Sequence, residues 1–493
     1  DSTAHELLMR LLHAASVPYL SSLHQWIYKG VVVDPYMEFM VEERKELSKE
    51  SLSHDVLSTY WQQRYTLRGP DAIPDFLFKA AENILTTGKY LNAVRECGRT
   101  DVCASALEGP IEYDYSGREI MRHVGAAFDF ASQELLDHLR REVDFVGRLR
   151  SIKRFFLLDQ GDFLVHFLDI AMDELAKDAS GVSRTRVQRL LDMALKTSTA
   201  ANDPYNDDLT CSIERKSVLQ LLCEVFYDPQ DLEEDFDPSD HLSLTRVATG
   251  VDMFTLDYRI QWPLSLVVTR RTLTKYQLIF RHLFHCKHVE RQLGTLWLDH
   301  QQTRKMSLAG SGPMYAAYLL GQQMMHFFQH LYNFMTFEAL EPNWDRLLEK
   351  MQAAPTIDRV ILEHEAFLDI ALRECMLTRP SILKQLEVLK SIGLAYVKLS
   401  QEFLSFEQLE VKPTHTLEQS FTSQLGVRPI SAIEKLEQSV NQPEFLKLVG
   451  DLKESFQTEL EEFITLLTAR SEPHLLNLVE RLDFNGFYGA SLD

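Results

Sequence analysis

The stretch MRHVGAAFDFASQELLDHLRREVDFVGRLRSIKRFF, residues 121–156, carries the pattern that decides the fold. Its apolar residues recur at steps of three or four, which places them along one side of an α-helix. They are Met121, Val124, Phe128, Ala131, Leu135, Leu139, Val143, Val146, Leu149, Ile152 and Phe156. The spacing predicts a helix of about 36 residues and roughly 54 Å, with Gly147 as the expected point of a bend or a break.

The same spacing continues through most of the chain. The sequence shows no convincing run of strictly alternating apolar and polar residues, no Asn-Gly hairpin turn and no repeat of the tetratricopeptide or armadillo kind. Gly (20) and Pro (17) are scarce for 493 residues, which disfavours a sandwich or barrel with many tight turns. We therefore predict an all-α fold, built as an elongated array of irregular helical bundles.

Composition narrows the class of protein. The formal charge is −21, from 72 acidic and 51 basic side chains, so we expect neither nucleic acid nor an anionic membrane surface as a partner. No run approaches the roughly 20 apolar residues that span a bilayer. The six cysteines form no CxxC pair, which predicts reduced thiols in the cytosol. Because the chain starts DSTAHELLMR, we expect a fragment that lacks an upstream portion.

Several segments are predicted to be connections because they are rich in small, polar or helix-breaking residues. The most acidic of them, DPQDLEEDFDPSD, has seven acids and no base. The main predicted connections are 68–74, 103–117, 228–240, 306–313 and 411–429.

The motif DQGD, residues 159–162, lies between two dense apolar runs. Glycine inside a helix costs about 1 kcal/mol relative to alanine, so Gly161 predicts a turn between two helices. Asp162 is then the expected N-cap of the second helix. The alternative is a pair of catalytic carboxylates, Asp159 and Asp162, in a hydrolase. A glycosidase-like pair also needs a polar cleft, which nothing nearby suggests, so no catalytic residue is predicted.

The motif HLFHCKH suggests a zinc site at first sight, because it supplies His282, His285, Cys286 and His288. On a helix the first three share a side and His288 points elsewhere, and no further pair of ligands is apparent. We therefore predict no metal site and no cofactor.

The segment WPLSLVVTRRTLTKYQLIFRHLFHCKHVERQLGTLW, residues 262–297, departs most from the acidic background. It combines an apolar stripe at helical spacing with six bases and the single acid Glu290. The bases are Arg270, Arg271, Lys275, Arg281, Lys287 and Arg291. They could pair with the chain's own surplus acids, or they could form a docking surface for an acidic protein. Spacing alone does not decide between these two readings.

Four long stretches resemble the gamma-tubulin complex proteins, and most closely the second member, which is the spindle-pole-body component type. They occur in the family's order and cover nearly the whole chain. The stretches are LLHAASVPYLSSLHQWIYKGVVVDPYMEFMVEE (11–43), TGKYLNAVRECG (87–98), LRSIKRFFLLDQGDFLVHFLDIAMDEL (149–175) and FTLDYRIQWPLSLVVTRRTLTKYQLIFRHLFHCKHVERQL (254–293).

The resemblance implies an all-helical scaffold rather than an enzyme. Residues 1–147 would be the later part of the N-terminal grip region, which makes lateral contacts, and residues 148–493 the C-terminal grip region, which binds gamma-tubulin. The implied partners are gamma-tubulin and other complex members, especially the third, in rings that template microtubule nucleation at a centrosome or spindle pole body. A GTP site would belong to gamma-tubulin.

Individual residues follow from the resemblance only in outline. Because tubulins are acidic, the six bases in 270–291 become a candidate part of the gamma-tubulin docking surface. The positions Trp26–Tyr28 and Asp34–Tyr36 are expected to fix packing in the first half, with a direct partner role as the alternative. A generic helical adaptor without gamma-tubulin binding stays open as the second hypothesis for the whole chain.

Overall fold

The computed structural model describes most of the chain. The described residues are 2–44, 63–99, 117–214, 249–306, 312–410, 442–469 and 473–484, with the short pieces 111, 113, 216, 218 and 220–222. The predicted connections 228–240 and 411–429 lie outside the described residues, as do nearly all of 103–117 and residues 307–311 of the connection 306–313.

In the described residues of the N-terminal part, there are three α-helices and one small sheet. The helices are α1 (Ser2–Lys29), α3 (Ala81–Glu96) and α4 (Arg118–Arg141), and the antiparallel strands are β1 (Val41–Glu43) and β2 (Tyr65–Leu67). Trp26 is fully buried and donates a hydrogen bond from Nε1 to the carbonyl oxygen of Ile84, 2.8 Å away. A Cβ atom on Gly88 would lie 1.9 Å from the Trp26 ring, so α1 and α3 can pack this closely only with glycine there.

The long helix predicted over residues 121–156 is two helices, α4 and α5 (Phe145–Phe156). The break lies at residues 142–144, upstream of Gly147, because Asp144 adopts a φ of 46° and its Oδ1 accepts a hydrogen bond from the Gly147 N–H at 3.1 Å. A Cβ on Gly147 would lie 2.0 Å from Oδ2 of Asp144. Gly147 therefore makes room for the cap of α5 instead of breaking the helix itself.

A turn over residues 157–160 joins α5 to α6 (Gly161–Leu175), as the DQGD motif predicts. The prediction that Asp162 caps α6 is wrong, because the N-cap residue is Gln160 and it makes no side-chain cap bond. The Asp162 carboxylate lies in the first turn and accepts hydrogen bonds from the N–H and Oγ1 of Thr199, at 2.9 and 2.6 Å. It therefore ties α6 to the segment that follows α7 (Arg184–Thr197).

Short strands are the main feature that the sequence missed. Besides β1 and β2, the strands β3 (Leu209–Ile213) and β4 (Phe254–Tyr258) pair antiparallel, with Leu209 opposite Tyr258. Each strand has only three to five residues, which is too short for an alternating pattern to stand out. Helices still dominate the described residues, which confirms the all-α class.

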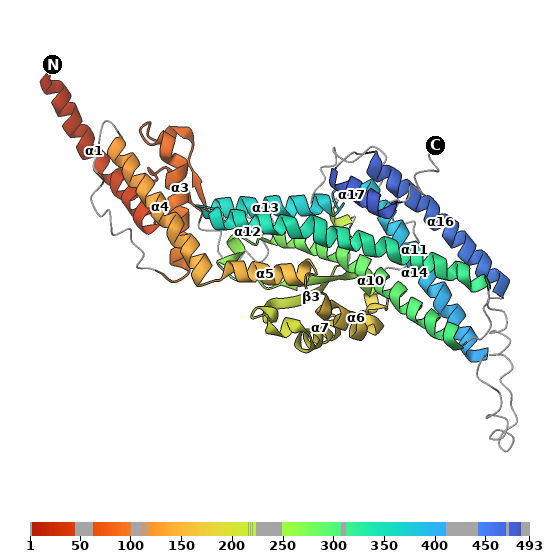
Figure 1. Ribbon diagram of the computed structural model, residues 1–493. Coiled ribbons are helices and arrows are strands. Elements are labelled where there is room, and N and C mark those ends of the chain that lie inside the picture. Colours follow the sequence, from red (N-terminus) through yellow and green to blue (C-terminus); the bar gives the residue numbers. More distant parts are fainter. Residues whose placement is uncertain are drawn as a thin grey trace.

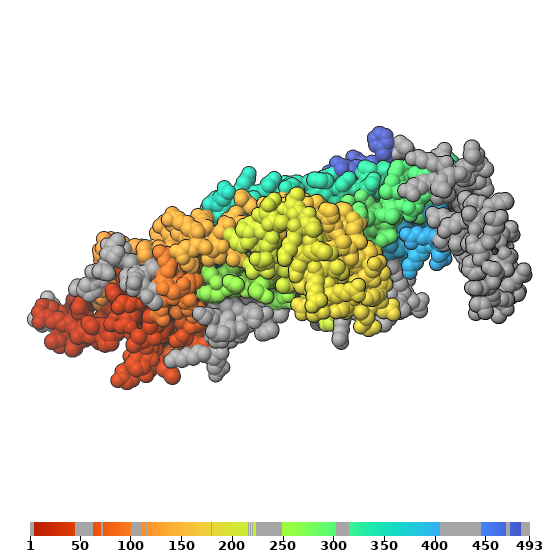
Figure 2. Space-filling view, turned by 90° about the horizontal axis from the view of Figure 1, so that it is seen from below, coloured from red at the N-terminus to blue at the C-terminus, as the bar shows by residue number. Residues whose placement is uncertain are grey.

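The body of the molecule is built on one long helix, α10 (Arg270–Met306), which contacts α11 (Gly312–Asn333), α13 (Ile357–Glu374) and α14 (Pro380–Glu410). The remaining helices are the π-helix Phe334–Leu340, α9 (Gly250–Met253), α12 (Glu341–Ala353), α16 (Gln442–Thr468) and α17 (Pro473–Leu482). Short 3-10 helices span Pro70–Ala72, Phe78–Ala80, Ala179–Gly181, Thr199–Asn202, Asn206–Asp208 and Leu264–Leu266. The elements form an elongated array (Figure 1), with α6 and α7 covering one face of the body in Figure 2.

The larger of two apolar core clusters runs from α3 to α17, and the smaller lies around Trp26 in the N-terminal part. Polar contacts join the two parts where α12 meets α13. Ser132 Oγ of α4 donates to the Pro355 carbonyl oxygen at 2.9 Å, and Arg140 donates to that of Met351 at 3.1 Å. The corner between α12 and α13 is therefore fixed against the N-terminal helices.

Candidate protein-interaction surfaces

The six bases predicted as a docking surface all lie on α10, but they do not share one face. A helix turns by about 100° per residue, so bases at these spacings point in three directions. They fall into the pairs Arg270 with Arg281, Arg271 with Lys275, and Lys287 with Arg291. The helix therefore presents no continuous basic stripe.

Within the described part of the chain, internal ion pairs involve four of these six bases. The pairs are Arg270–Asp257 at 3.0 Å, Lys287–Glu290 at 2.8 Å, Lys275–Asp369 and Arg291–Asp169. The Lys275 side chain is almost completely buried, whereas Arg270, Lys287 and Arg291 stay partly exposed. Arg271 is exposed. Pairing with the chain's own acids, the first of the two explanations above, is thus present for most of the stretch.

Arg281 stabilises the fold from the interior and is not part of the surface. Its side chain is buried, and Nη2 donates hydrogen bonds to the carbonyl oxygens of Lys216 and Asp252, at 2.9 and 2.8 Å. Burial lowers the pKa of the guanidinium to about 10. Arg281 therefore holds the segments at Lys216 and α9 against α10, and its charge does not reach the surface.

Three of the four candidate zinc ligands in the HLFHCKH motif are buried in the same interior, and the fourth, His285, is partly exposed. His282 is 1% exposed, and neither ring nitrogen has a hydrogen-bond partner in the described part of the chain. Burial, reinforced by the nearby Lys390, lowers the pKa of His282 to about 3. Burial also raises the pKa of the Cys286 thiol to about 11. Both groups are therefore uncharged at neutral pH and pack as core residues.

The described ranges of the chain also bear on metal binding and on membrane insertion. There, no group of three or more His, Cys, Asp and Glu side chains is arranged to hold a metal ion. The same ranges include no helix with the length and apolar character needed to cross a membrane.

The carboxylates of the DQGD motif bind different partners. Asp159 lies 3.8 Å from Lys153 Nζ, whereas Asp162 accepts hydrogen bonds from Thr199.

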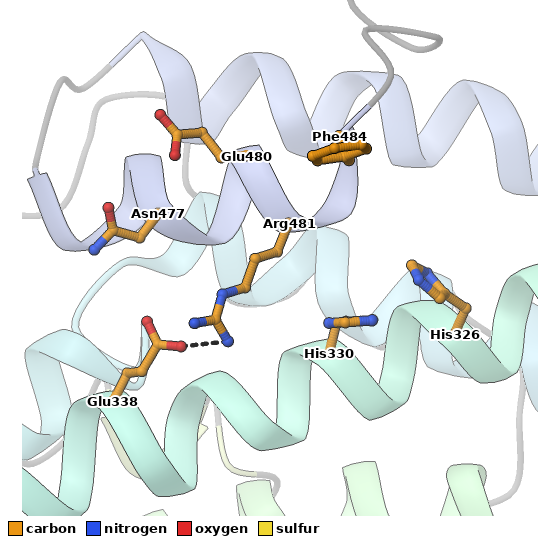
Figure 3. Close-up of a pocket in the computed structure, with 7 residues that line it drawn as sticks. All are labelled: His326, His330, Glu338, Asn477, Glu480, Arg481 and Phe484. Atoms are coloured by element: carbon orange, nitrogen blue, oxygen red, sulfur yellow. Dashed lines mark ion pairs between the residues drawn. The ribbon is translucent and has the colours of Figure 1, made fainter.

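An open cavity of about 610 Å³ lies between α11, the π-helix and α17 (Figure 3). The rings of His326 and His330 lie one helical turn apart, with centroids separated by 4.2 Å. Arg481 forms an ion pair with Glu338 at 2.5 Å, and the 88%-exposed ring of Phe484 stands at the rim. Burial, together with the charges of His326 and Arg481, lowers the pKa of His330. These side chains line the cavity with hydrogen-bonding groups and aromatic rings.

Apolar side chains are also exposed on α10 and α11, which pack against each other. His300 and Tyr318 are in ring contact there, with centroids 4.8 Å apart. Four exposed apolar residues lie within three positions of this contact in the sequence; this hairpin-end group is Trp297, Leu298, Tyr315 and Leu319. Trp297, the last residue of the apolar stripe in segment 262–297, is 42% exposed.

The N-terminal candidates divide between core and surface. Trp26 and Tyr28 are buried, which confirms their predicted packing role. Asp34 is largely enclosed, but Tyr36 is 82% exposed, so the prediction that it fixes packing is wrong. Its side chain projects from a loop instead of entering the core.

Comparison with known families gives two matches that together cover almost the whole chain. Residues 1–142 match the family described as gamma tubulin complex component N-terminal. Residues 145–488 match the family described as gamma tubulin complex component C-terminal. The two matches meet where the chain breaks between α4 and α5.

Individual relatives agree with these matches. The chain is 39% identical over 511 residues to gamma-tubulin complex component 2 of Mus musculus, covering 100% of this chain and 56% of the relative. It is 44% identical to gamma-tubulin complex component 2 of Arabidopsis thaliana, covering 82% and 58%. It is 30% identical to spindle pole body component alp4 of Schizosaccharomyces pombe, covering 78% and 55%. The chain thus spans little more than half the length of these relatives.

Proposed function

This chain belongs to the gamma-tubulin complex component family, and from that membership we propose that it is a structural subunit of the gamma-tubulin complex that binds gamma-tubulin. The observation that carries the proposal is the pair of family matches, N-terminal and C-terminal, in one chain and in the family's order. The relatives named above are called complex or spindle-pole components, and none of their names describes an enzyme. We place the subunit at a microtubule-organising centre.

The proposed division of labour follows the two matched segments. Residues 1–147 make lateral contacts with neighbouring components, especially the third member, and residues 148–493 bind one gamma-tubulin. The two segments are rigidly connected, since Ser132 and Arg140 of α4 hold the corner between α12 and α13. A rigid connection presents gamma-tubulin at a set position, so part of the entropy cost of assembling a microtubule nucleus is met in advance.

The proposed docking surface combines charge and apolar area on α10 and α11. Four of the six bases reach solvent and can attract an acidic partner, namely Arg270, Arg271, Lys287 and Arg291. Lys275 and Arg281 are buried and would act only by holding the fold. The hairpin-end group on α10 and α11 supplies the apolar contacts, which usually contribute more to affinity than exposed charges do.

The test is to mix the purified chain with gamma-tubulin and to measure the mass of the complex by size-exclusion chromatography with light scattering. We expect a one-to-one complex. We expect Trp297→Ser with Tyr315→Ser to weaken it about tenfold or more. Reversal of Arg271, Lys287 and Arg291 to Glu should weaken it mainly at low salt, because exposed charges are screened.

A matched control is Leu362→Ser on α13, which removes an exposed apolar side chain from a different helix and should leave binding unchanged. Failure of the folded chain to bind active gamma-tubulin would remove the proposal and leave a generic helical adaptor. A complex that resists both sets of substitutions would keep gamma-tubulin as the partner and move its docking surface elsewhere on the chain.

A further inference from the structure

A short loop in the N-terminal part, residues 33–38 (VDPYME), displays apolar side chains from a fixed backbone; we call it the Tyr36 loop. It connects α1 to β1 near the N-terminal end of the molecule (Figure 1). Tyr36 is 82% and Met37 is 76% exposed, and Val33 is also exposed. Directly after the loop, Phe39 and Met40 are buried, so the chain passes from the surface to the core within two residues.

The sequence of the loop favours a turn. Aspartate is common at the first position of a turn and proline at the second, where its fixed φ fits. The Asp34 carboxylate accepts hydrogen bonds from the N–H groups of Glu38 and Phe39, both at 2.9 Å. These bonds close the loop on itself through a side chain that is only 9% exposed.

Two further contacts pin the loop to its surroundings. Arg68, which follows β2, donates to the carbonyl oxygen of Met37 and lies 3.6 Å from Asp34 Oδ2. Ser22 of α1 donates from Oγ to the Val33 carbonyl oxygen at 3.2 Å. The base of the loop is therefore held by α1 on one side and by the end of the β1–β2 sheet on the other.

Met37 adopts a φ of 58°, in the left-handed region that a residue with a side chain seldom occupies. Glycine would meet this geometry without strain. The chain instead has a methionine there and leaves its side chain in solvent. Neither the backbone conformation nor packing in the core therefore explains a methionine at this position. Strained conformations of this kind are concentrated at contact and functional sites.

The charges around the loop indicate what kind of partner fits it. Asp34 and Arg68 neutralise each other at the base, and the tip residues Pro35, Tyr36 and Met37 carry no charge. A chain of net charge −21 repels another acidic protein over most of its surface. An uncharged apolar tip allows close approach without like-charge repulsion, and a preorganised loop loses little entropy on binding.

We propose that the Tyr36 loop inserts Tyr36 and Met37 into an apolar hollow on a neighbouring gamma-tubulin complex component. This inference rests on the proposed function, which assigns lateral contacts to residues 1–147. It adds the element that makes the contact and the chemistry of the surface that receives it. Tyrosine and methionine suit this role, because both are enriched at the buried centres of protein interfaces.

The test measures the association of the whole chain with the purified third family member by analytical ultracentrifugation. We expect the double substitution Tyr36→Ser and Met37→Ser to raise the Kd at least about tenfold. Two controls are expected to leave the Kd unchanged. Glu38→Gln removes the exposed acid beside the tip, and Leu362→Ser removes an exposed apolar side chain on α13.

The substitution Met37→Gly separates binding from stability. It relieves the left-handed strain, so the urea midpoint of unfolding should stay the same or rise, while the Kd for the partner should rise. A fall in stability with unchanged Kd would overturn the proposal, because Met37 would then be a structural residue. Weakening by Glu38→Gln alone would also overturn it, because the receiving surface would then be charged.

The outcome also tells this inference apart from the proposed function. If the wild-type chain and the double variant associate equally well, lateral association stands and the Tyr36 loop is not the contact. If the folded wild-type chain does not associate with any complex component, the lateral role proposed for residues 1–147 fails first. Gamma-tubulin binding, measured in parallel, should be unaffected by every loop variant.

Discussion

The phenolic hydroxyl of Tyr90 in α3 donates a hydrogen bond to Oδ2 of Asp358 in α13, at 2.7 Å and across 268 residues of sequence. The Tyr90 side chain is fully buried, and both burial and the Asp358 carboxylate raise its pKa, so the phenol stays protonated as the donor. The bond lies in the same region as the contacts from Ser132 and Arg140. Together they join the N-terminal helices to the corner between α12 and α13.

Tyr90→Phe should lower the free energy of unfolding by about 1–2 kcal/mol, because it removes a buried hydrogen bond to a carboxylate without creating a cavity. Urea unfolding, followed by circular dichroism, measures the change. The matched control is Tyr205→Phe, which removes a bond from an outer tyrosine to Asp144 and should cost less than about 0.5 kcal/mol. Equal effects of the two substitutions would show that the Tyr90 bond has no special weight.

Gly88→Ala should be strongly destabilising. The added Cβ would lie 1.9 Å from the Trp26 ring, so α1 and α3 must separate at a cost of about 1–3 kcal/mol or more. Gly125→Ala in α4 is the control, since nothing lies within 4 Å of its Cβ position. It should stabilise the protein by about 0.5–1 kcal/mol through helix propensity. Thermal unfolding of both variants gives shifts of opposite sign if the close packing is as described.

Arg281→Glu should lower the free energy of unfolding by roughly 3–5 kcal/mol, because it puts an acid beside two carbonyl oxygens in the interior. Arg271→Glu, on the surface of the same helix, should stay within about 0.5 kcal/mol of the wild type. Urea unfolding compares the two. A folded and stable Arg281→Glu variant would contradict the structural role and reopen a docking role for this residue.

Acid should destabilise the protein through its buried histidines. The pKa of His282 is lowered to about 3 in the folded chain, against about 6.5 when unfolded, so the unfolded state binds the proton first. The contribution of uncharged His282 to the free energy of unfolding is therefore complete above about pH 6.5. It is lost progressively as the pH drops toward 3. For this group alone, the loss between pH 7.5 and 5.5 is on the order of 1 kcal/mol.

The variant His282→Leu isolates that contribution. Leucine fills a similar space and removes two ring nitrogens that have no partner among the described residues, so stability at pH 7.5 should be kept or raised. The difference in unfolding free energy between pH 7.5 and 5.5 should shrink by on the order of 1 kcal/mol relative to the wild type. An unchanged difference would mean that His282 is not the group that titrates.

The sequence predicted the helices better than it predicted the side-chain contacts that end and connect them. Helical spacing located α4 and α5, but the break between them depends on the left-handed φ of Asp144 and its bond to Gly147, which no apolar pattern encodes. The DQGD turn was predicted correctly, but the predicted cap of α6 was wrong, because the Asp162 carboxylate binds Thr199, 37 residues away, and the N-cap residue is Gln160. Strands of three to five residues left no readable pattern at all.

The candidate site shows the same limit. The six bases of α10 lie within one segment, 270–291, and suggest one basic surface. However, Lys275 and Arg281 are buried while Arg271 is exposed. The sequence pattern does not distinguish the buried bases from the exposed ones. The acids that meet them, such as Asp257 and Asp369, are supplied by β4 and α13.

The sequence by itself determined the all-α class, the family resemblance and the buried role of the aromatic residues around Trp26. These follow from the spacing of apolar residues and from long strings of particular residues, which are local properties of the chain. Only the tertiary structure decided which charges reach solvent, and that Tyr36 and Met37 project from a pinned loop. The physical reason is that exposure and pairing depend on which distant segment packs against a residue, as Asp358 does against Tyr90.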